Sequence, residues 1–390
     1  MNSQSAQRSL RLMTIEMVAT SVLISMPIMN VFYAQEIGMD LTQVGLSQAA
    51  CAAALLLLNI PTGWISDRFS RKWSNVFGDV LSGIALLLYA TAHSFGEVVT
   101  YEILFGIGAA FSNGVDSALL ETYTRQLGRS FQPTLATISS WRYTMEFCGM
   151  IIGGLIGAAN PRLAIALSAT GFLIGAAASL WLVEPHERRV TEHNPLRDMW
   201  HVTTHSIWHD RRLALAIAAF VLGRESTHSL IWIMTPLLIF AGAPPALLGT
   251  AWAINLLLAL IGSQLARRYG NVLPPSRIVM VGVIVLTIGL GTLSIWMNIW
   301  TIALFGVVGW TRGWFGSTLL ADVIHHTAHD VKTTVASIAD SISRLIYIPL
   351  VPIIVGIGQD DLRRSTLATL IVFVPLLLIV SFRLTRYEKK

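Results

Sequence analysis

Long apolar segments separated by short polar turns run through the whole chain. Twelve of them approach or exceed about 20 residues, the length at which a helix spans a bilayer. They cover residues 12–34, 43–62, 74–93, 98–120, 135–158, 163–183, 213–240, 246–266, 277–296, 298–320, 334–356 and 364–385. Lipid cannot satisfy open backbone groups, and the period-two alternation of a membrane barrel is missing. The pattern predicts an all-α membrane protein with twelve transmembrane helices, the first of them retained rather than cleaved as a signal peptide.

The composition and the charge distribution also indicate a protein of the lipid bilayer. Hydrophobic residues make up 54% of the chain and charged residues 13%, whereas soluble domains carry about 25% charged residues. Lysines and arginines gather on the loops that share a side with both termini, and the opposite loops carry only Arg162, Arg363 and Arg364. Because positive loops stay in the cytoplasm, we expect a multi-pass protein of the cytoplasmic (inner) membrane with both termini inside. This topology explains the net charge of +5, and no basic patch with interleaved aromatic residues indicates a nucleic-acid partner.

The longest polar stretch divides the chain into two similar halves. The run of residues 63–72 has a weaker copy at 262–268, and residues 134–140 match 334–340. Both matches lie roughly 200 residues apart, and two matches at one offset indicate an internal repeat. Two parallel six-helix halves are typical of transporters that bind their solute near the membrane midplane. We predict an N-terminal six-helix bundle over 1–183, a cytoplasmic linker with a surface helix over 184–212, and a C-terminal six-helix bundle over 213–390.

A family resemblance rests on the polar stretch after the second span. Its pattern, Gly63-x-x-x-Asp67-Arg68-x-x-Arg71-Lys72, is similar to the signature loop between helices two and three of the major facilitator superfamily. Pro61-Thr62-Gly63 before it, and the glycine-rich run from Gly106 to Gly114, most resemble the branch of drug and metabolite exporters. The resemblance implies the major facilitator fold, with two pseudo-symmetric six-helix bundles that rock about a central site.

By this resemblance the loop forms a cytoplasmic latch. Its carboxylate would accept hydrogen bonds at the start of the eleventh span, near Thr333, where a helix N-terminus favours an anion. The glycine would allow close helix approach, and the basic residues would hold the loop at the anionic inner leaflet, although for Lys72 a simple topology signal fits equally well. The latch residues are Gly63, Asp67, Arg68, Arg71 and Lys72.

Three departures from the family pattern affect the mechanism. Ala266 stands in the second copy where the first has Asp67. Glu102 stands where proton-coupled members often carry an arginine, and the glycines of residues 149–157 lack the proline of the antiporter motif. The direction of transport and arginine-based coupling therefore stay open at this level.

Ionisable residues inside the predicted spans define the candidate site. A charge at the bilayer centre costs about 2.5–3.5 kcal/mol on insertion scales, so such residues usually face a cavity and have a role. Span seven places three ionisable residues within about one turn, and spans five and eleven each carry a charged pair one turn apart. The candidates for substrate binding and proton coupling are Asp116, Arg142, Glu146, Arg224, Glu225, His228, Arg312, Asp340 and Arg344.

Two interpretations of these charges compete. In the first, Arg142 or Arg344 binds an anionic or zwitterionic solute, and Glu146, Glu225 or Asp340 exchanges a proton. In the second, the charged pairs are structural locks between helices. Four further acids lie nearer the inner ends of their spans, where snorkelling or loop anchoring is expected: Glu16, Asp79, Glu121 and Asp322.

Motifs for catalysis and for metal binding are absent from the sequence. It contains no phosphate-binding loop, nucleophile elbow or zinc-protease helix, so we expect neither an enzyme nor direct use of ATP. His201, His205 and His209 recur every fourth residue in the linker, but no cysteine lies nearby, and a solvated helix face is expected there rather than a metal site. We expect no cofactor, and a proton gradient as the driving force.

The sequence therefore predicts a monomeric secondary active transporter that moves a small organic solute by alternating access among membrane lipids. Proton-coupled export, as in an efflux antiporter, is the first hypothesis, and it rests on the branch resemblance. Uptake or uniport of an organic anion is an alternative, indicated by the intramembrane arginines. A transporter-like sensor or scaffold that no longer transports is another, indicated by Ala266 and Glu102.

The latch hypothesis predicts that Asp67→Asn stops transport while expression stays normal, because an amide cannot provide the anion that the helix N-terminus favours. Solute-driven proton flux in liposomes, followed with an enclosed pH dye, measures this. Unchanged flux in the variant would contradict the latch.

Overall fold

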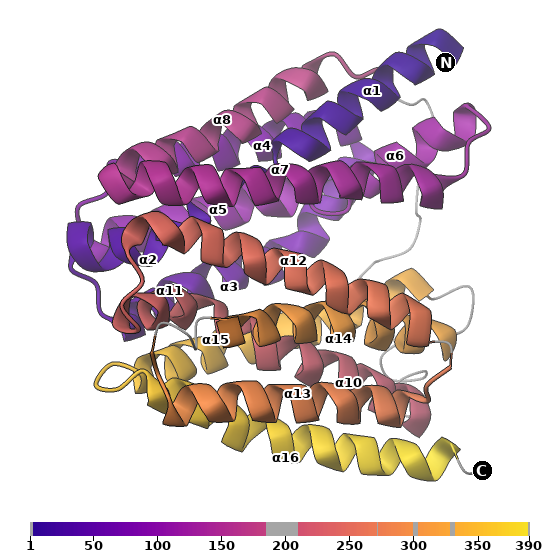
Figure 1. The fold of residues 1–390 in the computed structure, drawn as a ribbon. Coiled ribbons are helices and arrows are strands. Elements are labelled where there is room, and N and C mark those ends of the chain that lie inside the picture. The colour runs from indigo at the N-terminus through magenta and orange to yellow at the C-terminus, as the bar shows by residue number, and fades with distance from the viewer. Residues whose placement is uncertain (1–2, 185–209, 271, 299–302, 328–331, 389–390) are drawn as a thin grey trace. The chain divides into compact units, whose positions relative to one another are not determined.

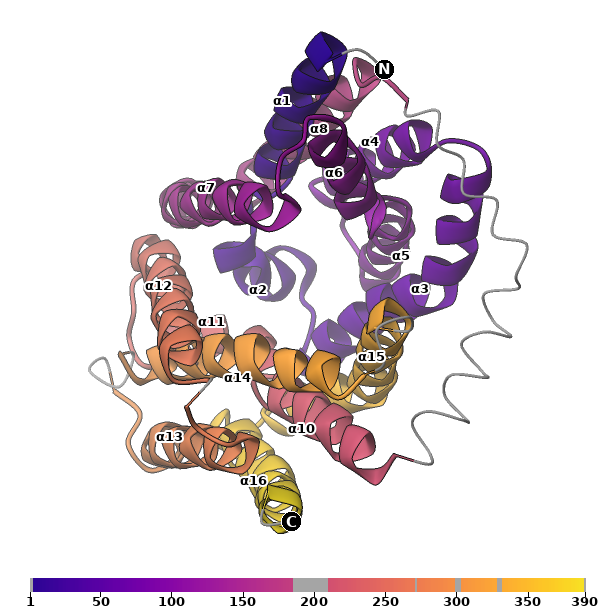
Figure 2. The ribbon, with the colours of Figure 1, turned by 90° about the vertical axis from the view of Figure 1, so that its right-hand side faces the viewer.

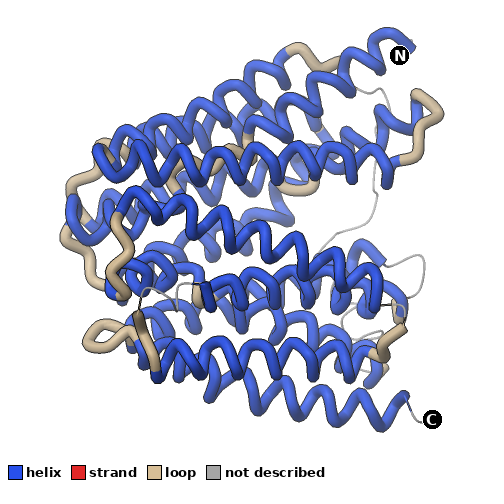
Figure 3. Tube along the Cα trace, viewed as in Figure 1, coloured by secondary structure: helices blue, strands red, loops and turns tan. Residues whose placement is uncertain are grey.

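The structure is a computed structural model that describes residues 3–184, 210–270, 272–298, 303–327 and 332–388. Within these residues the chain forms helices joined by short turns, without a strand (Figures 1 and 3). Packing divides the chain into two compact units. Unit 1 contains Met1–Met39, Ala50–Glu192 and Pro245–Ala253, and unit 2 contains Asp40–Ala49, His193–Pro244 and Ile254–Lys390. The domain boundaries taken from the sequence stay predictions, and the linker histidines His201, His205 and His209 lie outside the described residues.

The described helices follow the predicted spans in order. Their bounds are α1 (Ser3–Ala19), α2 (Met29–Val31), α3 (Leu41–Arg68), α4 (Arg71–Tyr89), α5 (Phe95–Ser112), α6 (Val115–Gln126), α7 (Phe131–Ala159), α8 (Pro161–Leu180), α10 (Arg211–His228), α11 (Ile231–Phe240), α12 (Pro245–Tyr269), α13 (Pro275–Ile295), α14 (Phe305–His325), α15 (Lys332–Ile357) and α16 (Arg363–Glu388). Seven helical segments of the described chain are long and apolar enough to cross a membrane by length and composition. Helices α7, α10 and α14, which hold several of the candidate charges, are not among the seven.

Three predicted spans are not single helices. The first ends as α1 at Ala19 and resumes with a 3₁₀ turn at Met26–Ile28, where Pro27 lies in the first turn, a position at which proline is tolerated. The fourth breaks between α5 and α6, where Gly114 adopts a φ of 80° that favours glycine. The seventh breaks after His228, where the hydroxyl groups of Thr227 and Ser229 donate back to carbonyls of the preceding turn.

The latch sequence is mostly helical, which corrects its prediction as a loop. Helix α3 continues through Gly63 and Asp67 to Arg68, and α4 begins at Arg71. Only Phe69 and Ser70 separate the two helices. The resemblance implies a loop here, but hydrophilic residues also form helix ends that project beyond the apolar part of a span.

A matching polar contact fixes the start of one helix in each unit. In unit 1, the Ser70 hydroxyl donates to Glu184 Oε2 at 2.6 Å, and the Arg71 and Lys72 backbone N–H groups donate to the same carboxylate at 3.1 Å. In unit 2, the Ser276 backbone N–H donates to Glu388 Oε1 at 2.9 Å, and its hydroxyl donates to the other oxygen. The carboxylates satisfy orphan donors and suit the positive end of the helix dipole.

This contact joins corresponding helices in the two units. The residue Glu184 follows α8, which packs against α4 in unit 1, and Glu388 ends α16, which packs against α13 in unit 2 (Figures 1 and 2). The helices of each pair are neighbours within their unit. The repeated device supports the internal duplication that the sequence predicts.

Helix α14 approaches α12 closely within unit 2. A Cβ atom added at Gly313 would lie 1.9 Å from the Ala259 carbonyl oxygen, and one at Gly309 would lie 2.1 Å from the Asn255 oxygen. These glycines are four residues apart, the spacing that lets membrane helices pack backbone to backbone. The Asn255 side chain adds a 2.8 Å hydrogen bond to the Phe305 carbonyl.

Replacing Gly313 with alanine should destabilise unit 2 by about 1–3 kcal/mol, because the added methyl group must push the two backbones apart. The midpoint of thermal unfolding of the purified protein in detergent measures this. Gly291→Ala is the matched control, since no atom lies within 4 Å of a Cβ there, and it should lose no stability. Equal midpoints for the two variants would contradict the close approach.

Candidate functional site

Unit 2 brings three of the predicted charged residues into one ion network. The Arg224 Nη1 group of α10 donates to Asp340 Oδ1 on α15. The Arg344 Nε group donates to the other oxygen of Asp340 at 2.8 Å from one turn further along α15. The three side chains are half-buried. One carboxylate therefore binds two guanidinium groups, and the network carries a net positive charge.

The other two candidates of span seven also find partners on α15. Glu225 is buried, and one of its carboxylate oxygens accepts a hydrogen bond from the Ser343 hydroxyl. Its other oxygen has no hydrogen-bond partner within the described residues. The His228 ring stacks on Tyr347 at 4.5 Å between centroids, and Trp232 Nε1 donates to the Tyr347 hydroxyl at 2.9 Å.

Two arginines and one histidine among the predicted candidates line a cavity of about 370 Å³ in unit 2. It is lined by Phe220, Arg224, Thr227, His228, Ile231, Arg312, Phe315 and Gly316. The basic groups come from two helices, α10 and α14, and the aromatic rings supply apolar walls. A concave, mostly apolar space with a few placed polar groups is the usual form of a small-molecule site.

The remaining predicted candidates belong to unit 1. Arg142 on α7 is exposed, and Glu146 one turn along the same helix is half-buried. Arg142 acts electrostatically on Asp116 of α6 and on Glu16 of α1. Asp116 is half-buried, and its Oδ1 atom is buried without a hydrogen-bond partner in the described part of the chain.

Two acids expected to snorkel are instead buried. Glu16 is 1% exposed and Asp79 is 2% exposed. Asn75 lies one turn before Asp79 on α4 and is fully buried. The signal that the sequence did offer is the polar stripe of Asn75, Asp79 and Ser82 at helical spacing, since a polar stripe on a membrane helix faces other helices.

Glu102, which departs from the family pattern, is held by two tyrosines. Its Oε1 atom accepts hydrogen bonds from Tyr89 at 2.9 Å and Tyr33 at 3.2 Å, and the two hydroxyl groups contact each other at 2.7 Å. All three side chains are buried. This position therefore serves a hydrogen-bonded network that joins α5, α4 and the short π-helical segment Phe32–Ile37.

The latch acid forms its ion pair locally. The Arg71 Nη2 and Nε groups donate to Asp67 Oδ1 at 2.7 and 2.9 Å. The Arg68 guanidinium lies 5.1 Å from the Trp64 ring centroid, and the Lys72 ammonium lies 5.5 Å from that of Trp73. A contact of Asp67 with the start of α15 would join the two units, and it stays a prediction.

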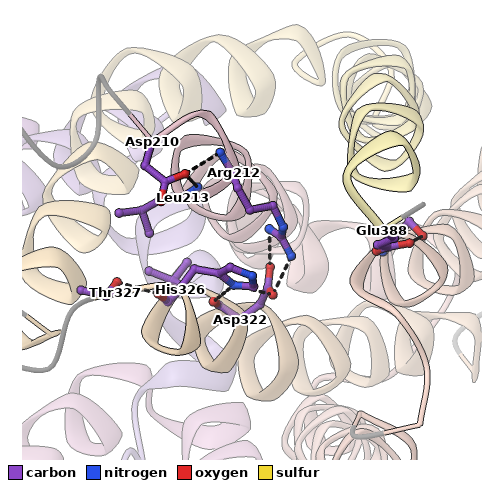
Figure 4. A network of polar contacts seen from close by, with 9 residues as sticks. Asp210, Arg212, Leu213, Asp322, His326, Thr327 and Glu388 are labelled. Atoms are coloured by element: carbon purple, nitrogen blue, oxygen red, sulfur yellow. Dashed lines mark hydrogen bonds and ion pairs between the residues drawn. The ribbon is translucent and has the colours of Figure 1, made fainter. Parts of the chain in front are cut away.

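A larger cavity of about 910 Å³ lies among helix ends in unit 2. Figure 4 shows its polar wall, where Arg212 donates to both oxygens of Asp322 at 2.9 and 3.0 Å. His326 Nδ1 lies 3.3 Å from the same carboxylate. Asp210 accepts hydrogen bonds from the first N–H groups of α10. Because its main charges already pair with each other and fix the ends of α10 and α14, we assign this cavity no part in the site.

Comparisons with known proteins agree on the architecture. The sequence model of the family described as Major Facilitator Superfamily matches residues 13–382. No curated protein matches the sequence. Among solved structures, a mutant of the nucleoside transporter NupG has a TM-score of 0.80 at 11% identity and covers 98% of this chain and 99% of its own. A bacterial homologue of the human lysosomal transporter Spinster, inward-facing and unoccupied, has a TM-score of 0.70 at 15% identity, with 98% and 97% covered. At these identities the likeness shows the fold alone.

Asp340→Asn should lower the free energy of unfolding by about 1–3 kcal/mol, because it leaves Arg224 and Arg344 close together without their shared carboxylate. Adding Arg224→Gln should recover part of that loss, and a double-mutant cycle on thermal unfolding midpoints measures the recovery. Asp360→Asn serves as the control, since its pair with Arg364 at 3.4 Å is exposed and such pairs contribute little. Strictly additive losses at Asp340 and Arg224 would contradict the network.

Proposed function

The chain belongs to the major facilitator superfamily, and on this premise we propose that it couples the movement of a small organic solute with a negative charge to the movement of protons. Family membership and the transporter neighbours make it a multi-pass membrane protein and a secondary transporter, not an enzyme. The predicted major facilitator fold with twelve membrane helices is confirmed.

The observation that supports a negatively charged solute is the cavity in unit 2. Arg224, His228 and Arg312 line one space of about 370 Å³, with Phe220 and Phe315 beside them. A carboxylate or phosphate on the solute would bind guanidinium groups through charge-assisted hydrogen bonds. Arg224 already holds such a group in Asp340, so the solute anion would compete with, or join, an existing carboxylate partner.

The proton-exchanging group proposed for this unit is Glu225. It is buried next to Arg224 in sequence, and only one of its oxygens has a hydrogen-bond partner in the described residues, namely Ser343. A change in the neighbouring arginine pairs alters the field at this carboxyl group, which is how ion binding and proton binding are linked. Glu225 does not line the cavity, so it would exchange protons without contacting the solute.

Export from the cytoplasm is the proposed direction, and its support is the resemblance of the Gly106–Gly114 run to exporters. Uptake or uniport of an organic anion is the second candidate, and the two arginines of the cavity are its support, since they would bind an anion in either direction of transport. We place the protein in the cytoplasmic membrane with both termini inside, as a monomer. A scaffold that transports nothing has no need of a charge-lined cavity.

Arg312→Gln should weaken binding of organic anions by roughly 10–100-fold, because one charge-assisted hydrogen bond contributes about 1.5–3 kcal/mol. Titration calorimetry on the purified protein measures the affinity for a panel of organic anions, amphipathic cations and neutral drugs. Arg364→Gln is the control, because Arg364 is exposed and does not line the cavity.

The same panel added to liposomes with an enclosed pH dye tests the coupling and its direction. Proton movement driven by anions, and lost in Glu225→Gln, would support the proposal. Binding of cations or neutral drugs only, with Arg312→Gln unchanged, would overturn the proposed solute class. Labelled-solute exchange without proton movement would identify a uniporter.

A further inference from the structure

Unit 1 contains an ionisable cluster of its own, formed by Glu16 on α1, Asp79 on α4 and Asp116 on α6. We propose that this cluster is a second proton-binding site, separate from Glu225, which takes up and releases protons during the transport cycle. The inference rests on the proposed proton coupling and adds a site to it. Three observations support it: the convergence of the acids, their unpartnered oxygens, and the imbalance of charge around them.

The three acids converge from different helices on one place in unit 1. A Cβ atom added at Gly175 of α8 would lie 3.1 Å from Asp79 Oδ2 and 3.5 Å from Glu16 Cγ. The absence of a side chain at Gly175 thus lets α8 pack directly over these two acids. Asp116 acts electrostatically on both, and the Asn75 side chain interacts with Glu16 and Asp116.

The cluster presents four buried oxygen atoms that lack a hydrogen-bond partner within the described residues. They are Glu16 Oε2, Asn75 Oδ1, Asp79 Oδ2 and Asp116 Oδ1. The partners that do exist are few: Ser112 donates to Asp79 Oδ1 at 3.2 Å, and the Asn75 amide, which donates to Ser179 at 3.2 Å, also interacts with Glu16 and Asp116. Buried polar atoms in native proteins are nearly always paired. The acceptor oxygens in this set outnumber the donors, and protons on the carboxyl groups would supply the donors that are missing.

Charge around the cluster is also unbalanced. The cation that acts on it is Arg142 of α7, which influences Glu16 and Asp116. The residues of α5 and α8 that contact the cluster in the described chain are uncharged, namely Ser112, Gly175 and Ser179. One arginine cannot balance three carboxylates in a medium of low dielectric constant. Protons remove the excess negative charge and also supply the missing donors.

A proton fits this cluster better than a metal ion. Metal coordination needs several ligand oxygens at about 2.0–2.6 Å from one centre. Among the described residues, no group of three acidic, histidine or cysteine side chains lies close enough to hold a metal ion. Carboxyl groups that are near each other without sharing one centre can still share protons and titrate together.

Infrared difference spectra between acidic and alkaline buffer test the site without any solute. The protein carries Glu225→Gln, so that the proposed proton-exchanging carboxyl group of unit 2 contributes nothing to the spectrum. Protonated buried carboxyl groups give a carbonyl band, which should be present in this background and lost in part in Glu16→Gln and again in Asp79→Asn. Glu121→Gln is the control, because Glu121 is exposed on α6, the helix that carries Asp116.

The outcomes of the infrared test separate the alternatives. A band that is absent before any cluster substitution, or that survives in all three of Glu16→Gln, Asp79→Asn and Asp116→Asn, overturns the proposal. A band that disappears when sodium replaces choline in the buffer identifies a sodium site and also overturns it. Thermal unfolding confirms that each variant is folded, and Asp116→Asn replaces either of the others if one of them is not.

Transport then shows whether the cluster takes part in coupling. Glu16→Gln should lose proton flux driven by the solute while it keeps exchange of labelled solute across the liposome membrane, since exchange needs no net proton movement. Normal coupled flux in all three variants would overturn the cluster's role in the cycle. Absence of coupled flux in the unsubstituted protein would instead overturn the proposed function, and the infrared result would still decide whether the cluster binds protons.

Discussion

Hydrocarbon offers no hydrogen bonds, so the polar groups that this chain buries in its spanning helices depend on partners within the protein. The two units meet this constraint differently. In unit 2, Asp340 binds Arg224 and Arg344, and Ser343 donates to Glu225. In unit 1, Glu16, Asp79 and Asp116 lie together and leave oxygens without donors in the described chain. The first arrangement suits exchange of one anion for another, and the second suits exchange of protons.

The two units resemble each other in their helix ends rather than in their polar interiors. Ser70 and Glu184 in unit 1 repeat as Ser276 and Glu388 in unit 2, each joining the start of one helix to the end of its neighbour. These contacts hold neighbouring helices together at their ends and depend only on the geometry of a helix N-terminus. The charged residues inside each unit take no part in these helix-end contacts, so they differ between the units while the helix-end contacts are the same.

Close backbone packing supports the polar interior of unit 2. Gly309 and Gly313 bring α14 onto the backbone of α12, and Arg312 lies between these glycines in sequence. The helix face that carries the glycines therefore packs against α12, and Arg312 and Gly316 line the cavity beside this contact. A rigid helix contact of this kind positions a charged side chain more firmly than a loop could.

The apolar runs by themselves determined the order and approximate bounds of the spanning helices, because only a helix of that length satisfies its backbone in lipid. Sequence spacing also predicted that Asp340 and Arg344 lie one turn apart on the same helix. It did not predict that Arg224 would join them, since that contact joins helices more than a hundred residues apart. Hydropathy likewise placed Glu16 and Asp79 near the inner ends of their spans, where a snorkelling side chain and a buried one have the same sequence pattern. Only the packing of α1, α4, α6 and α8 decided that these acids face each other, because burial of a side chain depends on which helices surround it.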